Sequence, residues 1–331
     1  MFSGIFSILS FVVLLGVLIF IHELGHFLTA KRVGIRVDRF SLGFPPNIFV
    51  KKWRGTEYCI GMIPLGGFVK MAGESPDETP SGNSDEFSSK TIFQRFMVIA
   101  AGPFMNYLLA IGLFSFLMFV YGEPHTSETR AIIGGVSEEG PAASAGLETD
   151  DIIISVDGQP VGNFDSLRTL ISPRPNQELV VEWLRGSETM TASMTPALKE
   201  VTLESGEIDS VGQIGVLTKI LYERKTGFFG SIAVGFSRTN HMVIQIFSFV
   251  KSYISGQVKS NSVGGPIYIA QQSATAAKLG LYSFLAFMAM LSVNLAVLNV
   301  LPIPVLDGGH LVFLTIEKIK GSPLTMKTSV Y

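Results

Sequence analysis

Apolar residues along the chain gather in three long blocks, at about residues 5–30, 96–121 and 281–301. A helix needs about 20 mainly apolar residues to cross a bilayer, so each block is long enough. The second and third blocks contain no Asp, Glu, Lys or Arg, and the first has none before residue 22. This pattern predicts a multi-pass α-helical membrane protein with three spans.

A fourth apolar stretch, Phe228 to Val250, carries Arg238 and His241 near its middle. Charged and polar residues inside a span are costly, so the pattern favours an amphipathic or interfacial helix. A crossing here would also reverse the direction of the third span and place Asp307 on the opposite membrane face from His22. We therefore expect this stretch not to cross.

Basic residues predict the orientation of the spans. Ten Lys or Arg residues lie between residues 31 and 95, none precedes Lys31, and the next one is Arg130. Since basic residues are enriched in cytoplasmic connections, the first connection is expected inside the cell, and the N-terminus and the second connection outside.

The first part of the chain, residues 1–122, is expected to hold two spans and a cytoplasmic connection. Within that connection, residues 37–71 alternate as in a short β-hairpin close to the membrane, with a turn at Arg54-Gly55. Residues 73–90 are acidic and rich in Ser and Pro, which predicts a flexible loop.

Residues 127–197 are predicted to form a small extracytoplasmic α/β domain. Its strands are expected at Arg130–Val136, Asp151–Val156, Leu179–Leu184 and Thr189–Met194, and its helices at Ala142–Ala145 and Phe164–Ile171. Residues 198–278 are expected to be an extracytoplasmic linker with amphipathic helices. Residues 279–331 are expected to hold the third span and a short cytoplasmic tail.

Composition agrees with a membrane protein and narrows its partners. Charged residues make up 16% of the 331 residues, against about 25% in soluble domains. The net charge is −2 and no tract is rich in Lys or Arg, which argues against a nucleic-acid partner. The single cysteine, Cys59, excludes an intramolecular disulfide and a cysteine-based zinc site.

The most specific chemical signal is the segment His22-Glu23-Leu24-Gly25-His26, inside the first apolar block. On a helix, His22 and His26 lie four residues apart and share one face, as two nitrogen ligands of a tetrahedral zinc would. Glu23 beside them is suited to act as the base that activates a metal-bound water. Ionisable residues within a span are usually functional, so we interpret the segment as a zinc site.

A catalytic zinc commonly has three protein ligands, so one more is required. Asp307 follows the third span, at the same predicted membrane depth as His22, and is the expected third ligand; His310 is the rival. Pro302 and Pro304 are expected to break the helix before it, and Gly308-Gly309 to permit tight turns.

Two amides in the third span, Asn294 and Asn299, need hydrogen-bond partners in an apolar setting. Two interpretations are open. They could contact an extended substrate or stabilise an oxyanion, or they could bond neighbouring helices.

Together these segments resemble the site-2 protease family of intramembrane zinc metalloproteases, of the bacterial sigma-E-regulating type. The resemblance rests on HELGH, on AGPFMNY (Ala101–Tyr107), on SVGGPIYIA (Ser262–Ala270) and on NVLPIPVLDGGH (Asn299–His310). Residues Gly140–Gly158 resemble a PDZ domain of bacterial proteases.

The resemblance implies a Zn²⁺ metalloendopeptidase in the bacterial inner membrane, with its active site near the cytoplasmic side. His22, His26 and Asp307 would bind the metal, Glu23 would be the catalytic base, and Asn294 and Asn299 would contact substrate. Substrates would be transmembrane segments of single-pass proteins, such as anti-sigma factors or signal-peptide remnants. The hairpin would present them as an extended strand, and the PDZ domain would filter or dock them.

The family pattern also includes a fourth span after the DGGH segment and, in some members, two PDZ domains. Leu311–Tyr331 is too short and too charged to cross, so the fourth span is expected to be missing, and a single PDZ domain is expected. An alternative function follows, that of a catalytically disabled membrane adaptor which binds peptide C-termini through its PDZ domain.

Overall fold

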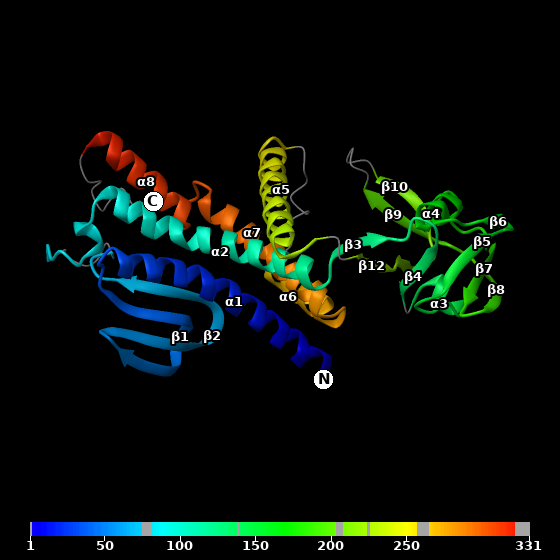
Figure 1. The fold of residues 1–331 in the computed structure, drawn as a ribbon, viewed down its shortest axis with the longest axis horizontal. Helices are drawn as coiled ribbons and strands as arrows, with labels where there is room; N and C mark the ends of the chain where they lie inside the picture. Colours follow the sequence, from blue (N-terminus) through cyan, green and yellow to red (C-terminus); the bar gives the residue numbers. More distant parts are fainter. Residues whose placement is uncertain are drawn as a thin grey trace. The chain divides into compact units, whose positions relative to one another are not determined.

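The computed structural model describes residues 2–74, 81–137, 139–202, 208–223, 226–256 and 265–321. The chain divides into a helical unit, Met1–Val120 with Thr226–Tyr331, and a β-rich unit, Tyr121–Lys225 (Figure 1). Several predicted segments are described only in part. The residues outside the description are 75–80 of the flexible loop, 138 of the α/β domain, 203–207, 224–225 and 257–264 of the linker (which include 262–264 of the Gly-Pro stretch), and 322–331 of the tail.

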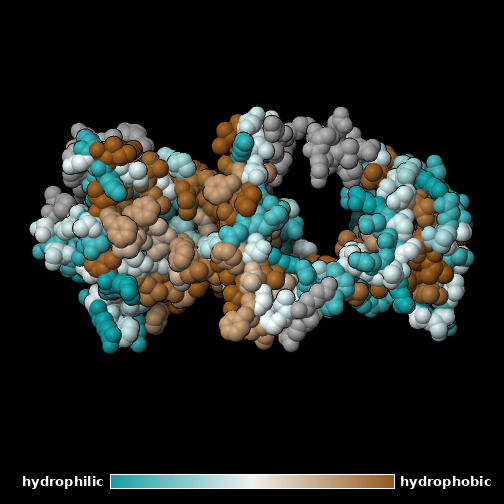
Figure 2. Space-filling view, turned by 45° about the horizontal axis from the view of Figure 1, so that its top comes forward, coloured by the Kyte–Doolittle hydropathy of each residue, from teal (hydrophilic) through white to brown (hydrophobic). Residues whose placement is uncertain are grey.

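In the described ranges, the helical unit consists of six α-helices, a 3₁₀-helix at Phe87–Ser89 and one β-element. The helices are α1 (Phe2–Arg32), α2 (Ile92–Val120), α5 (Phe228–Ile254), α6 (Pro266–Lys278), α7 (Leu281–Val300) and α8 (Asp307–Lys320). Three stretches in the described part, within α1, α2 and α7, are long and apolar enough to cross a membrane. Hydrophobic side chains gather over the surface of these helices (Figure 2). The chain is therefore an integral membrane protein.

Apolar packing joins the three candidate spans. Leu14 and Leu18 of α1 and Met288 of α7 are buried together, and Leu109 and Leu113 of α2 pack against them. Since lipid is as apolar as these side chains, close packing rather than escape from water holds the helices together.

Helix α5 packs against α2 and crosses it steeply (Figure 1). The Tyr107 hydroxyl of α2 donates to Asn240 Oδ1 of α5 at 3.1 Å, and Thr239 is fully buried. Polar groups therefore lie in the contact between α5 and α2. Among the described helices, α5 is not one of the candidate spans.

The β-element is larger and more curled than a short hairpin. Strands β1 (Val37–Trp53) and β2 (Thr56–Met71) pair antiparallel, and the first part of β1 pairs with both ends of β2. Ser41, for example, lies opposite both Cys59 and Phe68. The sequence predicted only a short hairpin. Alternation of apolar and polar residues indicates strands and turns, but it does not show that a long hairpin folds back and pairs with itself. Residues 67–71 consequently form an edge of this small sheet.

Residues 81–90 differ from the predicted flexible loop. Glu86 is buried, and its carboxylate accepts hydrogen bonds from the backbone N–H groups of Ser81 and Gly82, at 3.2 and 3.1 Å. The Arg36 and Phe87 backbone N–H groups donate to Asp85 and Ala72. An acidic, Ser-rich composition gives no indication that one carboxylate caps the loop from inside.

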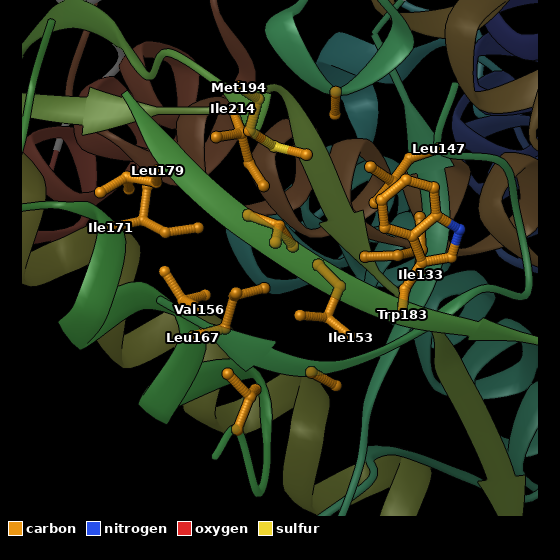
Figure 3. Close-up of a cluster of buried hydrophobic side chains, with 14 residues drawn as sticks. Ile133, Leu147, Ile153, Val156, Leu167, Ile171, Leu179, Trp183, Met194 and Ile214 are labelled. Carbon is orange, nitrogen blue, oxygen red and sulfur yellow. The ribbon is translucent and has the colours of Figure 1, made fainter. Parts of the chain in front are cut away.

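The β-rich unit is built around an antiparallel sheet whose strands differ in length and follow the order β11-β4-β5-β7-β8. These strands are β11 (Val216–Thr218), β4 (Ala131–Val136), β5 (Ile152–Val156), β7 (Leu179–Arg185) and β8 (Glu188–Met194); β6 (Gln159–Pro160) pairs with β5. Helices α3 (Pro141–Ser144) and α4 (Phe164–Ile171) complete the core. Trp183, Ile133, Ile153 and Leu167 are among its buried side chains (Figure 3). Helix α4 begins at a capping box formed by Asn163 and Ser166.

The predicted end of this domain at residue 197 is wrong, because β11 belongs to its sheet. Strands β9 (Ala197–Thr202) and β10 (Ile208–Gln213) form a separate hairpin, and β12 (Ile220–Glu223) pairs with β3 (Glu123–Thr126). Strands β10, β11 and β12 and nearly all of β9 fall in the region predicted as linker, whereas β3 precedes the predicted domain. A three-residue edge strand is too short to give a recognisable alternation, and only its partner β4 defines it.

An ion pair between Asp151 and Arg185 joins the adjacent ends of β5 and β7, which pair at Ile152 and Leu184. Asp151 is 1% exposed, and Arg185 donates to both of its carboxylate oxygens, at 2.9 and 2.8 Å. Burial raises the pKa of Asp151, but the Arg185 hydrogen bonds and the Glu148 N–H outweigh it and hold the pKa below its ordinary value.

We predict that Asp151→Asn lowers the melting temperature of the β-rich unit at neutral pH. Since the folded pKa lies below the unfolded one, the ionised carboxylate stabilises the fold above about pH 4, and this stabilisation is lost as pH falls through the folded pKa. Fluorescence of the buried Trp183, in a Trp53→Phe background, should report the transition. An equal melting temperature of both proteins at pH 7 would contradict the prediction.

Candidate metal centre

Helix α1 places three polar side chains on its side that faces α2 and the β-element. His22 and His26, four residues apart, lie on one helical face, and Glu23 lies beside them on the neighbouring face. His26 is buried at 8% exposure, and the other two are partly buried. The helix continues unbroken through the segment, so the two imidazoles have a fixed separation.

The two imidazoles and the Asp307 carboxylate converge on one point. His22 Nε2 and His26 Nε2 lie 3.2 Å apart, and they lie 3.1 and 3.6 Å from Asp307 Oδ2 and Oδ1. Tetrahedral ligands at about 2.0–2.1 Å from a zinc ion would lie about 3.3 Å from one another. Asp307 Oδ2 is buried without a hydrogen-bond partner in the described part of the chain. This donor set and its spacing fit a zinc ion.

Asp307 owes its position to a break between α7 and α8. Helix α7 ends at Val300, before Pro302 and Pro304, and α8 begins at Asp307 itself, where the helix N-terminus favours a negative charge. The prediction of tight turns at Gly308 and Gly309 is wrong, because both residues lie in the first turn of α8. A Cβ at Gly308 would overlap the carbonyls of Val300 and Leu301, so glycine there permits close packing of α8 on the end of α7.

Helices α1 and α2 approach closely at the site because each carries a glycine, which has no side chain, at the contact. A Cβ at Gly25 would overlap the Ala101 backbone, and a Cβ at Gly102 would overlap the rings of His26 and His22. Removing the side chain at these positions lets α2 pack directly against the imidazoles. The packing explains why this part of α2 is rich in small residues.

We predict that Gly102→Ala weakens zinc binding by roughly 10- to 100-fold, the range seen when groups around metal ligands change. The added methyl group would displace the imidazole rings. Gly112→Ala on the same helix is the matched control, because a Cβ there meets nothing within 4 Å. Zinc affinity of purified protein, measured by chelator competition, should fall only for Gly102→Ala; an equal affinity of both variants would contradict this.

Helix α2 also contacts the outer ring nitrogens of the two histidines. His26 Nδ1 lies 2.9 Å from the Val98 carbonyl oxygen. His22 Nδ1 lies 3.4 Å from Nδ2 of Asn106, which is fully buried. Each imidazole thus has one nitrogen toward Asp307 and one toward α2.

An ion pair holds α8 against α2. Arg95 Nη2 lies 2.7 Å from Glu317 Oε1, and the two side chains are only 14% and 12% exposed. Because α8 begins at Asp307, this contact also fixes the helix that carries the carboxylate. The charge of the Leu311–Tyr331 segment gives no indication of this contact, since the partner of Glu317 is 222 residues away.

Glu23 faces the edge of the β-element. A Cβ at Gly67 would lie 3.2 Å from Glu23 Cγ, and the carboxylate lies against the backbone of Val69. Both residues belong to the 67–71 edge segment, beside which no further strand is paired in the described residues. The carboxylate thus lies next to backbone that could pair with another extended segment.

The remaining predicted residues lie apart from this cluster. His310 is exposed on α8 and is not among the grouped ligand atoms, which are those of His22, His26 and Asp307. Asn294 and Asn299 are partly buried on α7, and neither side chain has a hydrogen bond within the described ranges. The structure therefore does not bring these two amides to the cluster through any hydrogen bond.

Sequence reasoning missed the groups that surround the cluster. The sequence patterns assign none of Val98, Gly102 and Asn106 to the site, although all three lie on one face of α2 at helical spacing. Their spacing of four residues, opposite two histidines also four apart, is the signal that could have indicated them.

Comparison with known proteins identifies the family. The model of peptidase family M50 matches residues 10–331. The chain belongs to peptidase family M50. Among its M50 relatives is the regulator of sigma-E protease RseP from Escherichia coli, 30% identical over 426 aligned positions that cover 98% of this chain and 93% of the relative. A protein named as a zinc metalloprotease from Agrobacterium fabrum is 33% identical over 338 positions, covering 96% and 88%.

Two solved structures are similar to part of this chain. One is the PDZ domain of an SdrC-like protein from Listeria innocua, with 23% identity, a TM-score of 0.22, and coverage of 27% of this chain and 92% of that one. Another is the PDZ domain of an SdrC-like protein from Listeria monocytogenes, with 18% identity, a TM-score of 0.21, and coverage of 28% and 90%.

Proposed function

We propose that this M50 chain is an intramembrane zinc endopeptidase that cleaves transmembrane segments of single-pass membrane proteins. The observation that carries the proposal is the convergence of His22, His26 and Asp307 beside Glu23 within the helical unit. Two carboxylates and two imidazoles lie together among membrane helices. Removing these groups from water is costly, and a bound cation would offset that cost.

Metal binding and proton transfer would be carried out by different residues. His22, His26 and Asp307 would hold Zn²⁺, which when bound polarises a peptide carbonyl and makes water easier to deprotonate. Glu23 would accept the proton of the attacking water and then deliver it to the leaving amine. Its position beside the ligands, rather than among them, keeps the carboxylate free for proton transfer.

Substrate would bind as an extended strand along residues 67–71. A helical segment hides its peptide carbonyls, so it must unwind before attack, and pairing with a sheet edge would offset the lost helical hydrogen bonds. The edge lies beside Glu23, and an apolar cavity of about 420 Å³ adjoins it between α1 and the β-element. Glycines at positions 16, 43, 61 and 66 line this cavity, so apolar substrate side chains would fit there.

The β-rich unit would act as an extracytoplasmic PDZ domain that docks or filters substrates before cleavage. Basic residues in the first connection would keep the metal centre near the cytoplasmic side of the bacterial inner membrane. Substrates would then be proteins shortened by an earlier cut outside the membrane, such as anti-sigma factors or signal-peptide remnants. Asn294 and Asn299 would contact the unwound segment from α7.

The test is cleavage of a single-pass model substrate by the full chain in proteoliposomes, with and without a zinc chelator. We expect cleavage to stop when zinc is removed and to return when zinc is added back. Cleavage that continues in zinc-free protein would contradict the proposal. Peptide binding by a chain that never takes up zinc would favour the adaptor function instead.

A further inference from the structure

Asn106 is a fully buried amide on α2 that faces the His22 ring. Its side-chain Oδ1 is buried and has no hydrogen-bond partner in the described part of the chain. An unsatisfied acceptor of this kind is costly in an apolar region. The Asn106 side chain therefore has an acceptor, Oδ1, that is available for a hydrogen bond, and it lies next to the His22 ring of the metal centre.

In His26, the ring nitrogen that points away from Asp307, Nδ1, has a hydrogen-bond acceptor beside it. Its Nδ1 lies 2.9 Å from the Val98 carbonyl, which can only accept a hydrogen bond. Nδ1 of His26 must therefore carry the proton, and Nε2 has a free lone pair toward Asp307. A hydrogen bond on the outer nitrogen thus selects the tautomer that can bind a metal.

His22 has the same requirement but a different partner. Its Nε2 faces Asp307 Oδ2 and His26 Nε2, so metal binding leaves the proton on Nδ1. A donor at Nδ1 requires an acceptor, and the Asn106 amide is the group that lies there. Rotation of this amide by 180° places Oδ1, in place of Nδ2, toward the ring.

We propose that Asn106 is a positioning residue for His22, whose Oδ1 accepts a hydrogen bond from Nδ1–H and holds the metal-binding tautomer. The inference rests on the proposed zinc site and adds a residue to it. The Asn106 backbone is itself fixed, because Ser292 Oγ of α7 donates to its carbonyl oxygen at 2.7 Å. Asn106 thereby connects α1, α2 and α7 at the depth of the metal centre.

Three variants of the full chain test the proposal through metal binding rather than activity. Asn106→Leu removes the acceptor while keeping the number of side-chain heavy atoms, Asn106→Asp keeps an acceptor, and Ser292→Ala removes only the neighbouring helix contact. We expect Asn106→Leu to weaken zinc binding about 10- to 100-fold in chelator competition. Asn106→Asp and Ser292→Ala should remain within a few-fold of wild type. Asn106→Ala, which adds no bulk, replaces the leucine variant if that one does not fold.

The visible spectrum of the Co²⁺-substituted protein gives a second readout, because it reports ligand geometry. Asn106→Leu should change the spectrum and Asn106→Asp should restore it. Wild-type zinc affinity and spectrum in Asn106→Leu would overturn the inference, as would equal losses in Asn106→Leu and Ser292→Ala, which would indicate a packing role. A wild-type protein that binds no zinc would overturn the proposed function itself.

Discussion

Replacing Glu23 with glutamine is expected to reduce cleavage of a membrane-anchored substrate by at least ~10²-fold while leaving zinc bound. General acid–base groups contribute typically about 10²- to 10⁴-fold to a rate, and an amide cannot accept the proton of the attacking water. Glutamine has nearly the same shape as glutamate, so the packing against Gly67 should be kept. The ligand set of His22, His26 and Asp307 is unchanged in this variant.

The measurement is the initial rate of cleavage in proteoliposomes, together with zinc content of the same preparation. Glu188→Gln, an exposed carboxylate on β8 of the β-rich unit, is a control for loss of one negative charge and should cleave as wild type. Equal cleavage by wild type and Glu23→Gln would exclude Glu23 as the base. Loss of zinc from Glu23→Gln would instead indicate that the carboxylate has a structural part in the metal centre.

Replacing Asp307 with alanine is expected to remove the metal, with zinc content falling from about one ion per chain to near none. Two imidazoles alone fall short of the three protein ligands that catalytic zinc sites use. The Asp307 carboxylate lies 3.1 Å from the ring nitrogen of His22 and 3.6 Å from that of His26. Its removal would also end proteolysis, since the chemistry of Glu23 depends on the bound ion.

Elemental analysis of purified protein measures this effect directly. His310→Ala is the matched control, because His310 lies one turn further along α8 and is exposed rather than grouped with the ligands. Retained zinc in Asp307→Ala, or loss of zinc in His310→Ala, would contradict the assigned ligand set. The first outcome would require another third ligand, and the second would require α8 to bind the metal in a different register.

Local patterns in the sequence predicted much of the architecture. The three apolar blocks correspond to helices α1, α2 and α7, and alternation located β4, β5, β7 and β8 to within a residue or two. These elements could be predicted because span length and strand alternation depend only on neighbouring residues. Peptidase family membership, indicated by HELGH and the segments after it, is confirmed by the match over residues 10–331.

The failures share one cause, which is dependence on distant partners. Strand β11 has three residues and is defined by pairing with β4, about 80 residues earlier in the chain. The 81–90 segment is held by Glu86 and by backbone bonds to Arg36 and Ala72. Gly308 and Gly309 were interpreted as turn residues, but the carbonyls at the end of α7 explain them better.

The sequence by itself determined which side chains could take part in zinc chemistry. A helix fixes the i,i+4 spacing of His22 and His26, and the break before Asp307 follows from two prolines. Only the tertiary structure decided how these groups meet. Gly25 and Gly102 let α1 and α2 approach, Arg95 holds α8 in place, and Val98 and Asn106 come to lie behind the imidazoles. The tautomer of a ligand histidine depends on its outer partner, and that partner is set by packing between helices rather than by spacing along the chain.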